Sequence, residues 1–150
     1  GFRVDAQAVR EGLESVHWPG RLERIRTGDT EILLDAAHNP AGARALASYL
    51  RESGWTDATL VFGAMHDKDA RGMLEALAPA VRRIICTTAP TPRAEAADVL
   101  AQAAAAVPGV SDVKAIPEPA QALASAAAGS RRVVVAGSIF LIGPLRGILR

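Results

Sequence analysis

The sequence has little of what marks a disulfide-stabilised, membrane-spanning or nucleic-acid-binding protein. Cys86 is its only cysteine, which excludes an internal disulfide. No apolar run approaches the roughly 20 residues that cross a bilayer, and the first residues lack a charged-then-apolar signal pattern. The 17 basic and 16 acidic residues are spread along the chain, so no patch for a nucleic acid is expected. We therefore expect a cytoplasmic protein with neither membrane nor nucleic-acid partners.

Aromatic residues are also scarce, at 4% of the chain, although 49% of the residues are hydrophobic. The core must then be aliphatic, with alanine-rich helices packed closely together. A length of 150 residues matches one globular domain, so we expect residues 1–150 to form a single domain. Residues 1–17 are expected to be a linker region with a helix over about 5–15, capped by Asp5. Cys86 has no flanking His or basic partner and is expected to be a buried residue rather than a catalytic thiol.

The remaining chain alternates between two hydrophobic patterns. Apolar residues spaced i, i+3, i+4, i+7 indicate helices in the segments 43–50, 70–77, 96–103 and 120–127. Strand-forming runs lie at 59–62, 84–87, 113–116 and 133–136, and the runs 22–27 and 31–35 indicate a hairpin around Gly28-Asp29. This alternation predicts an α/β domain of the Rossmann-like, doubly wound class: a mostly parallel sheet of about six strands with helices on both faces, plus the amino-terminal hairpin strand. Ligands of such sheets bind where strands turn into helices.

The most informative of these turns follows the second hairpin strand. Asp35 stands at the strand end and His38 three residues later, while Asn39 and Pro40 are suited to cap and open the next helix. The positive end of that helix favours an anionic ligand, and Asp35 can accept hydrogen bonds from a ribose while His38 donates one to a phosphate oxygen. The alternatives are a plain cap for Asn39 and a loop histidine for His38. No third and fourth ligand accompany Asp35 and His38, so no metal is expected on this chain alone.

Four motifs occur in the order in which folylpolyglutamate synthases and dihydrofolate synthases carry their signatures. They are Pro19-Gly20-Arg21-Leu22-Glu23, Leu34-Asp35-Ala36-Ala37-His38-Asn39-Pro40, Val61-Phe62-Gly63 with Asp67-Lys68-Asp69, and Ala136-Gly137-Ser138 with Phe140-Leu141-Ile142-Gly143. From about Trp18 to Arg146 the chain resembles the carboxy-terminal domain of this family. The Asp-x-Ala-His-Asn-Pro form is more similar to it than to the related muramyl-peptide ligases. His66 departs from the smaller residue expected in the third motif.

The resemblance implies part of an ATP-dependent ligase. Such enzymes phosphorylate the terminal carboxylate of dihydropteroate or a (tetrahydro)folate with ATP, and the amine of L-glutamate then attacks the acyl phosphate. In the family the phosphate-binding loop, the Mg²⁺ ligands and most of the folate site belong to an amino-terminal ATPase domain, and this sequence holds no Gly-x-x-x-x-Gly-Lys-Ser/Thr motif. The chain by itself is then expected to be inactive, and its partners are that domain, ATP, L-glutamate and the folate substrate.

The resemblance also assigns ATP contacts to Arg21, Asp35 and His38. Asp35 is expected on the ribose, with Arg21 and His38 toward the phosphates. A guanidinium fork suits phosphate oxygens. Without the motif around it, Arg21 would be a solvated arginine on a strand edge.

Glutamate contacts are assigned to Lys68, Ser138 and Asn39, and no residue is assigned a catalytic role. An ammonium can pair with a substrate carboxylate, and the turn at Ser138 can offer backbone amides and a hydroxyl. Lysine occurs only at Lys68 and Lys114, whereas the other basic residues are arginines. The alternatives are a solvated loop lysine for Lys68 and a helix cap for Ser138. Asp69 is expected to cap the next helix.

Two other functions stay open on the sequence. The chain could be a free-standing module that binds a nucleotide or an amino acid, without a catalytic partner. It could also be the equivalent domain of a muramyl-peptide ligase, which keeps the chemistry and exchanges the folate for another acceptor.

Overall fold

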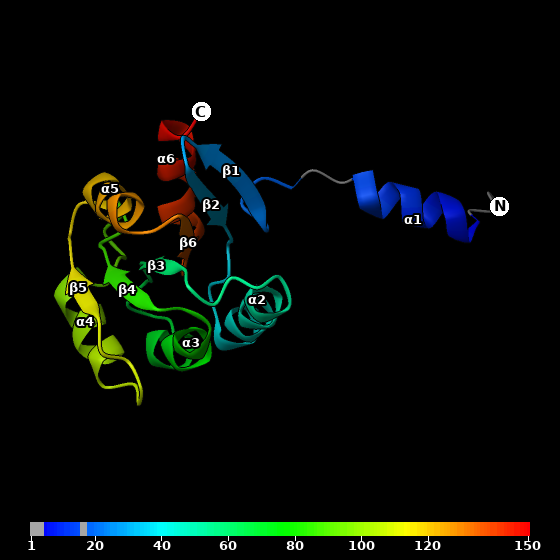
Figure 1. Ribbon diagram of the computed structural model, residues 1–150. Coiled ribbons are helices and arrows are strands. Elements are labelled where there is room, and N and C mark those ends of the chain that lie inside the picture. Colours follow the sequence, from blue (N-terminus) through cyan, green and yellow to red (C-terminus); the bar gives the residue numbers. More distant parts are fainter. Residues whose placement is uncertain (1–4, 16–17) are drawn as a thin grey trace.

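The computed structural model describes residues 5–15 and 18–150, and its elements alternate as predicted (Figure 1). In chain order they are α1 (Ala6–Ser15), β1 (Glu23–Thr27), β2 (Thr30–Leu34), α2 (Pro40–Glu52), β3 (Thr59–Phe62), α3 (Ala70–Leu77), the 3-10 helix η1 (Ala78–Ala80), β4 (Arg83–Cys86), α4 (Ala97–Ala105), β5 (Val113–Ala115), α5 (Pro119–Gly129), β6 (Arg132–Ala136) and α6 (Ile139–Ile148). One six-stranded sheet has the order β1-β2-β6-β3-β4-β5. The hairpin β1-β2 is antiparallel and the other pairs are parallel, which confirms the predicted α/β class.

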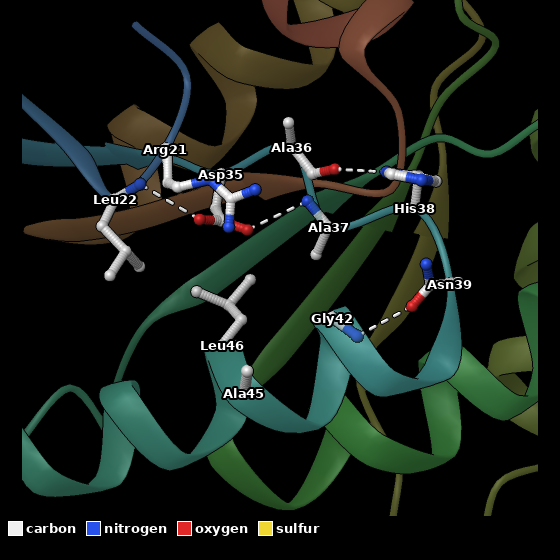
Figure 2. A pocket seen from close by; sticks show the side chains of 10 residues that line it. All are labelled: Arg21, Leu22, Asp35, Ala36, Ala37, His38, Asn39, Gly42, Ala45 and Leu46. Atoms are coloured by element: carbon white, nitrogen blue, oxygen red, sulfur yellow. Dashed lines mark hydrogen bonds between the residues drawn. The ribbon is translucent and has the colours of Figure 1, made fainter. Parts of the chain in front are cut away.

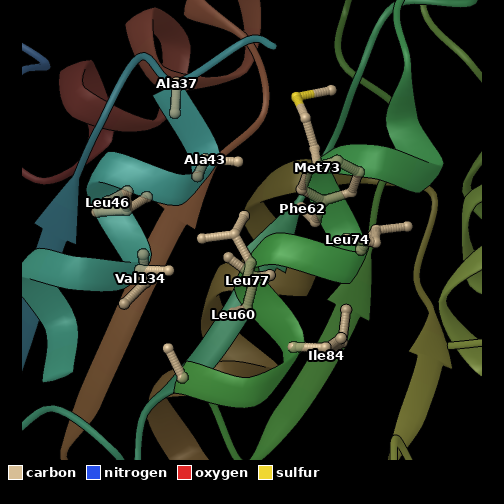
Figure 3. Packing of buried hydrophobic residues seen from close by; sticks show 14 of the residues in the cluster. Ala37, Ala43, Leu46, Leu60, Phe62, Met73, Leu74, Leu77, Ile84 and Val134 are labelled. Carbon is tan, nitrogen blue, oxygen red and sulfur yellow. The ribbon is translucent and has the colours of Figure 1, made fainter. Parts of the chain in front are cut away.

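Helices cover both faces of the sheet, as predicted. Successive residues of a strand point to opposite faces, so Val134 joins the core under α2, α3 and α4, while Val133 and Val135 join the core under α5 and α6. Figure 3 shows the first of these cores, where Leu46 from α2 and Leu77 from α3 pack over the sheet. Strands buried on both faces need continuous apolar runs, which explains why they lack strict alternation.

The amino-terminal helix agrees with the expectation as well. Asp5 Oδ1 accepts the backbone N–H of Ala8 at 2.7 Å and so caps α1, which stands clear of the sheet in Figure 1. No helix within the described ranges is long and apolar enough to span a membrane.

The strand order brings three strand-to-helix turns together. Strands β2, β6 and β3 are neighbours, while α2 leaves β2 on one face and α6 leaves β6 on the other, so this is where the sheet changes its winding direction. Backbone hydrogen bonds join these turns: Gly137 N donates to Ala37 O at 2.9 Å, and Gly63 N donates to Ala136 O at 3.2 Å. At Gly137 φ is +110°, and a Cβ there would lie 2.5 Å from Gly63 O. Only glycine fits so close an approach.

Candidate functional site

A cavity of about 230 Å³ lies at the end of β2, beside the start of α2 (Figure 2). Its lining comprises Arg21, Leu22, Asp35, Ala36, Ala37, His38, Asn39, Gly42, Ala45 and Leu46. We call it the first cavity. All three residues expected to contact ATP, Arg21, Asp35 and His38, therefore face one space.

Asp35 is buried, at 9% exposure, and its carboxylate already holds the local backbone. Oδ2 accepts the N–H of Leu22 at 3.0 Å and Oδ1 accepts the N–H of Ala37 at 2.9 Å. Each carboxylate oxygen has roughly two acceptor positions, so one on each oxygen remains for a ligand hydroxyl. Asp35 thus fixes the local backbone and keeps acceptor positions on the wall of the first cavity.

The surroundings of His38 define which ring nitrogen carries hydrogen. Nδ1 lies 2.9 Å from the carbonyl oxygen of Ala36, and a carbonyl oxygen only accepts, so Nδ1 is the protonated nitrogen. In the neutral ring Nε2 is then an acceptor. A hydrogen bond donated by His38 Nε2 to a phosphate oxygen therefore requires the imidazolium form, whereas the neutral ring can only accept a hydrogen bond there.

Asn39 and Arg21 complete the first cavity. Asn39 Oδ1 accepts the N–H of Gly42 at 2.8 Å, which confirms the predicted cap of α2 with Pro40 as its first residue. The side-chain amide of Asn39 keeps its donors, and its assignment to glutamate stays a prediction. The guanidinium of Arg21 lies 5.9 Å from the ring centroid of Trp18, whose side chain is 67% exposed.

A second cavity, of about 180 Å³, adjoins the first. It is lined by His38, Met65, Lys68, Arg93, Gly137, Ser138, Ile139 and Phe140. Two of the residues assigned to glutamate, Lys68 and Ser138, thus face the same space although they follow different strands. His38 lines both cavities and stands between the two groups of residues.

Arg93 adds a second cation that the sequence analysis did not identify. Its Nη2 donates to both oxygens of Asp67, each at 2.9 Å, and Lys68 Nζ lies 3.6 Å from Asp67 Oδ2. These hydrogen bonds from Arg93 lower the pKa of Asp67 below its ordinary value. Asp67 therefore keeps its charge and holds both cations at the rim of the second cavity.

Backbone contacts fix the two loops that carry these cations. His66 N donates to Arg93 O at 3.0 Å, and His66 Nδ1 lies 2.8 Å from the same oxygen. Met65 and Ala94 form an antiparallel bridge beside them. His66, which departs from the expected smaller residue, is thus part of the contact between the loops. The sequence signal that could have identified Arg93 is its place in the loop after β4, at the edge of the sheet where strands turn into helices.

Ser138 and the start of α6 supply the opposite wall. Ser138 is buried at 3% exposure, and its Oγ accepts the N–H of Phe140 at 3.1 Å, so it caps α6 as the structural alternative predicts. The hydroxyl hydrogen can still donate to a ligand, and the amino end of α6 favours negative charge. Ile139 and Phe140 remain 63% and 49% exposed at this rim.

The described residues offer no grouping of three or more His, Cys, Asp or Glu side chains for a metal. Asp69, which the sequence predicts as the cap of α3, accepts the N–H of Gly72 at 2.8 Å and confirms that prediction. The two cavities therefore bring together a carboxylate at Asp35, cationic side chains at Arg21, Lys68 and Arg93, and the imidazole of His38, which lines both.

Comparison with known proteins identifies relatives of this arrangement. The family model for the Mur ligase, glutamate ligase domain, matches residues 20–139. A probable bifunctional folylpolyglutamate synthase/dihydropteroate synthase of Halobacterium salinarum is 41% identical over 146 residues, covering 95% of this chain. This chain spans only 18% of that relative's length.

Solved structures agree over almost the whole chain. Folylpolyglutamate synthase of Mycobacterium tuberculosis, complexed with ADP and AMPPCP, superposes with a TM-score of 0.88 at 34% identity. The match covers 98% of this chain and 36% of the other. A bifunctional folylpolyglutamate synthase/dihydrofolate synthase with Mn, AMPPNP and L-glutamate bound superposes with a TM-score of 0.83 at 26% identity, covering 99% and 36% of the two chains.

Proposed function

This chain belongs to the family of Mur ligase glutamate ligase domains, and from that premise we propose that it is the glutamate-binding, ATP-site-closing domain of a larger ligase. The reaction is the ATP-dependent addition of L-glutamate to dihydropteroate or a (tetrahydro)folate through an acyl phosphate. The observation that carries the proposal is the pair of adjoining cavities, one with a carboxylate and an arginine, the other with two cations and a helix amino end, joined at His38. Similarity to synthases solved with ADP, AMPPCP and L-glutamate supports it.

The first cavity takes the nucleotide. The free acceptor positions of Asp35 bind ribose hydroxyls, and Arg21 lies on the same lining to reach phosphate oxygens. The amino end of α2 adds favourable potential for negative charge. Asp35 is held by two backbone N–H groups before any ligand arrives, so it needs no rearrangement to accept a ribose.

The second cavity takes L-glutamate. Lys68 and Arg93 attract one carboxylate, and the Ser138 hydroxyl with the first amides of α6 binds the other. The side chains of Lys68 and Arg93 are 38% and 56% exposed, so a substrate can reach them from solvent. The amine of the bound glutamate then lies near His38 and the nucleotide phosphates.

The chain completes the reaction only together with an amino-terminal domain. The phosphate-binding loop and the Mg²⁺ ligands are assigned to that domain by the family resemblance, and this sequence holds no Gly-x-x-x-x-Gly-Lys-Ser/Thr motif. Exposed Ile139 and Phe140 at the cavity rim give that domain an apolar surface to cover. The role of this chain is to orient L-glutamate and the nucleotide against the activated acceptor.

Phosphate release measures this function. The full-length protein is expected to release phosphate from ATP only when both a folate acceptor and L-glutamate are present. The isolated chain is expected to release none, and adding the separate amino-terminal domain is expected to restore release. Turnover by the isolated chain would refute the proposal.

The acceptor substrate distinguishes the folate reaction from that of a muramyl-peptide ligase. Dihydropteroate, tetrahydrofolate and a UDP-muramyl peptide are offered one at a time to the full-length protein with ATP and L-glutamate. Stimulation by a pterin acceptor alone supports the folate reaction. Stimulation by the muramyl peptide alone would move the proposal to the peptidoglycan branch of the family.

A further inference from the structure

We propose that Glu23 is a positioning residue of the nucleotide site, because it holds the turn of residues 18–22 so that Arg21 faces the first cavity. The proposal rests on the nucleotide role proposed for that cavity. Glu23 is part of the Pro-Gly-Arg-Leu-Glu motif, and the reaction described above gives it no role of its own. It does not line the first cavity, so it acts through its neighbours.

The contacts of Glu23 are those of a buried anchor. Its side chain is only 7% exposed, although it stands on β1 at the outer edge of the sheet. Its Oε2 accepts the N–H of Gly20 at 2.7 Å, and Arg146 Nε donates to Oε1 and Oε2 at 3.0 and 2.8 Å. Arg150 Nη2 lies 3.4 Å from Oε1. A carboxylate of such low side-chain exposure that accepts hydrogen bonds from this many donors is fixed in place.

The turn that Glu23 holds has an uncommon backbone. Leu22 has a φ of +48°, a left-handed conformation that a leucine keeps only where the surroundings impose it. Three contacts impose it here: Ala36 N donates to Gly20 O at 2.7 Å, Leu22 N donates to Asp35 Oδ2 at 3.0 Å, and Gly20 N donates to Glu23. Two of these contacts fasten the turn to the segment after β2, and Glu23 provides the third.

Arg21 depends on this turn for its direction. It lies between Gly20 and Leu22, the two residues whose backbone is held, and its own N donates to Trp18 O at 3.1 Å. Among the described residues no carboxylate pairs with Arg21 to orient its guanidinium independently, and the guanidinium lies near the ring of Trp18. Without Glu23 the turn loses its hydrogen-bonded tie to Arg146 of α6, and Arg21 loses its fixed position over the cavity.

A double-mutant cycle on the full-length protein tests this. ADP affinity is measured by calorimetry for the wild type, Arg21→Ala, Glu23→Gln and the double variant. If Glu23 acts through Arg21, Glu23→Gln weakens ADP binding by about tenfold, and the double variant binds no more weakly than Arg21→Ala alone. If the losses of ADP affinity in the two single variants multiply in the double variant, the positioning role is overturned. Unchanged ADP binding in Glu23→Gln overturns it as well.

A matched control lies on the same hairpin. Glu31 pairs with Arg24 at 3.3 Å on the exposed surface, so Glu31→Gln removes an ion pair of β2 without touching the turn, and its ADP affinity should equal that of the wild type. If Glu23→Gln does not fold, Arg146→Lys serves as the second variant, because it keeps the charge but loses the paired contact, and the same non-additivity is expected. If Arg21→Ala itself binds ADP normally, the nucleotide role of the cavity fails, and the positioning role falls with it.

Discussion

Replacing Asp35 by asparagine is expected to destabilise the domain by about 3 kcal/mol, before any effect on ligands is considered. Both oxygens of Asp35 accept backbone N–H groups, and an amide side chain keeps only one acceptor. Losing a hydrogen bond to a charged group costs about 1.5–3 kcal/mol, and the amide nitrogen would face an N–H that has no other partner. In a domain of this size, the change lowers Tm by roughly 6–12 °C.

Thermal unfolding of the chain, followed by circular dichroism at neutral pH, measures the effect. Asp29→Asn is the matched control, because Asp29 is an exposed aspartate in the hairpin turn and its replacement is expected to change stability by less than about 0.5 kcal/mol. If the two variants unfold at the same temperature, Asp35 does not hold the turn and the reasoning for its double role is refuted.

Three further predictions concern the backbone, the thiol and the pH dependence. Gly137→Ala is expected to lower the free energy of unfolding by more than about 2 kcal/mol, because the added Cβ would lie 2.5 Å from Gly63 O. Gly109→Ala, at φ +85° in open space, should lower it by only about 1 kcal/mol, and urea unfolding of both variants measures the difference. Burial raises the pKa of Cys86 to about 12, so its thiol should react with a disulfide reagent at pH 8 only after denaturation, and rapid labelling of the folded chain would contradict its burial. Hydrogen bonds from Arg146 lower the pKa of Glu23 below 4.5. The ionised Glu23 therefore stabilises the fold above about pH 4.5, and this stabilisation is lost as the pH falls through the lowered pKa. The stability difference between wild type and Glu23→Gln should shrink in acid, and a difference that grows there would contradict this sign.

Local sequence patterns predicted most of the secondary structure because their causes are local. The helix caps at Asn39 and Asp69 depend on residues three positions away, and the hairpin depends on the turn residues between its strands. The burial of the strand 133–135 follows from three consecutive valines. Such signals need no knowledge of which strands become neighbours.

The strand order could not be obtained in this way. The last strand, β6, lies between β2 and β3, and hydrophobic periodicity does not indicate pairing partners. That order is what places Ser138 beside Lys68 and His38 in one cavity. The sequence therefore predicted candidate site residues, but it could not show which of them line the same cavity.

Arg93 and Glu23 show the same limit at single residues. Arg93 lies in a loop without a motif, and its side chain is held by Asp67, 26 residues away. Glu23 looks like an exposed charge on an edge strand, yet it is buried by an ion pair with Arg146, 123 residues away. The contacts of both side chains are tertiary, so the local sequence around each residue does not indicate its partner.

The assignment of L-glutamate to the second cavity is tested most directly by steady-state kinetics of the full-length protein carrying Lys68→Met. Lys114→Met is the matched control, since Lys114 is the other lysine of the chain and lies exposed on β5. Loss of a charged contact is expected to raise the KM for L-glutamate by roughly 10- to 100-fold and to leave the KM for ATP within about twofold. An unchanged KM for L-glutamate, or an equal rise in Lys114→Met, would contradict the account.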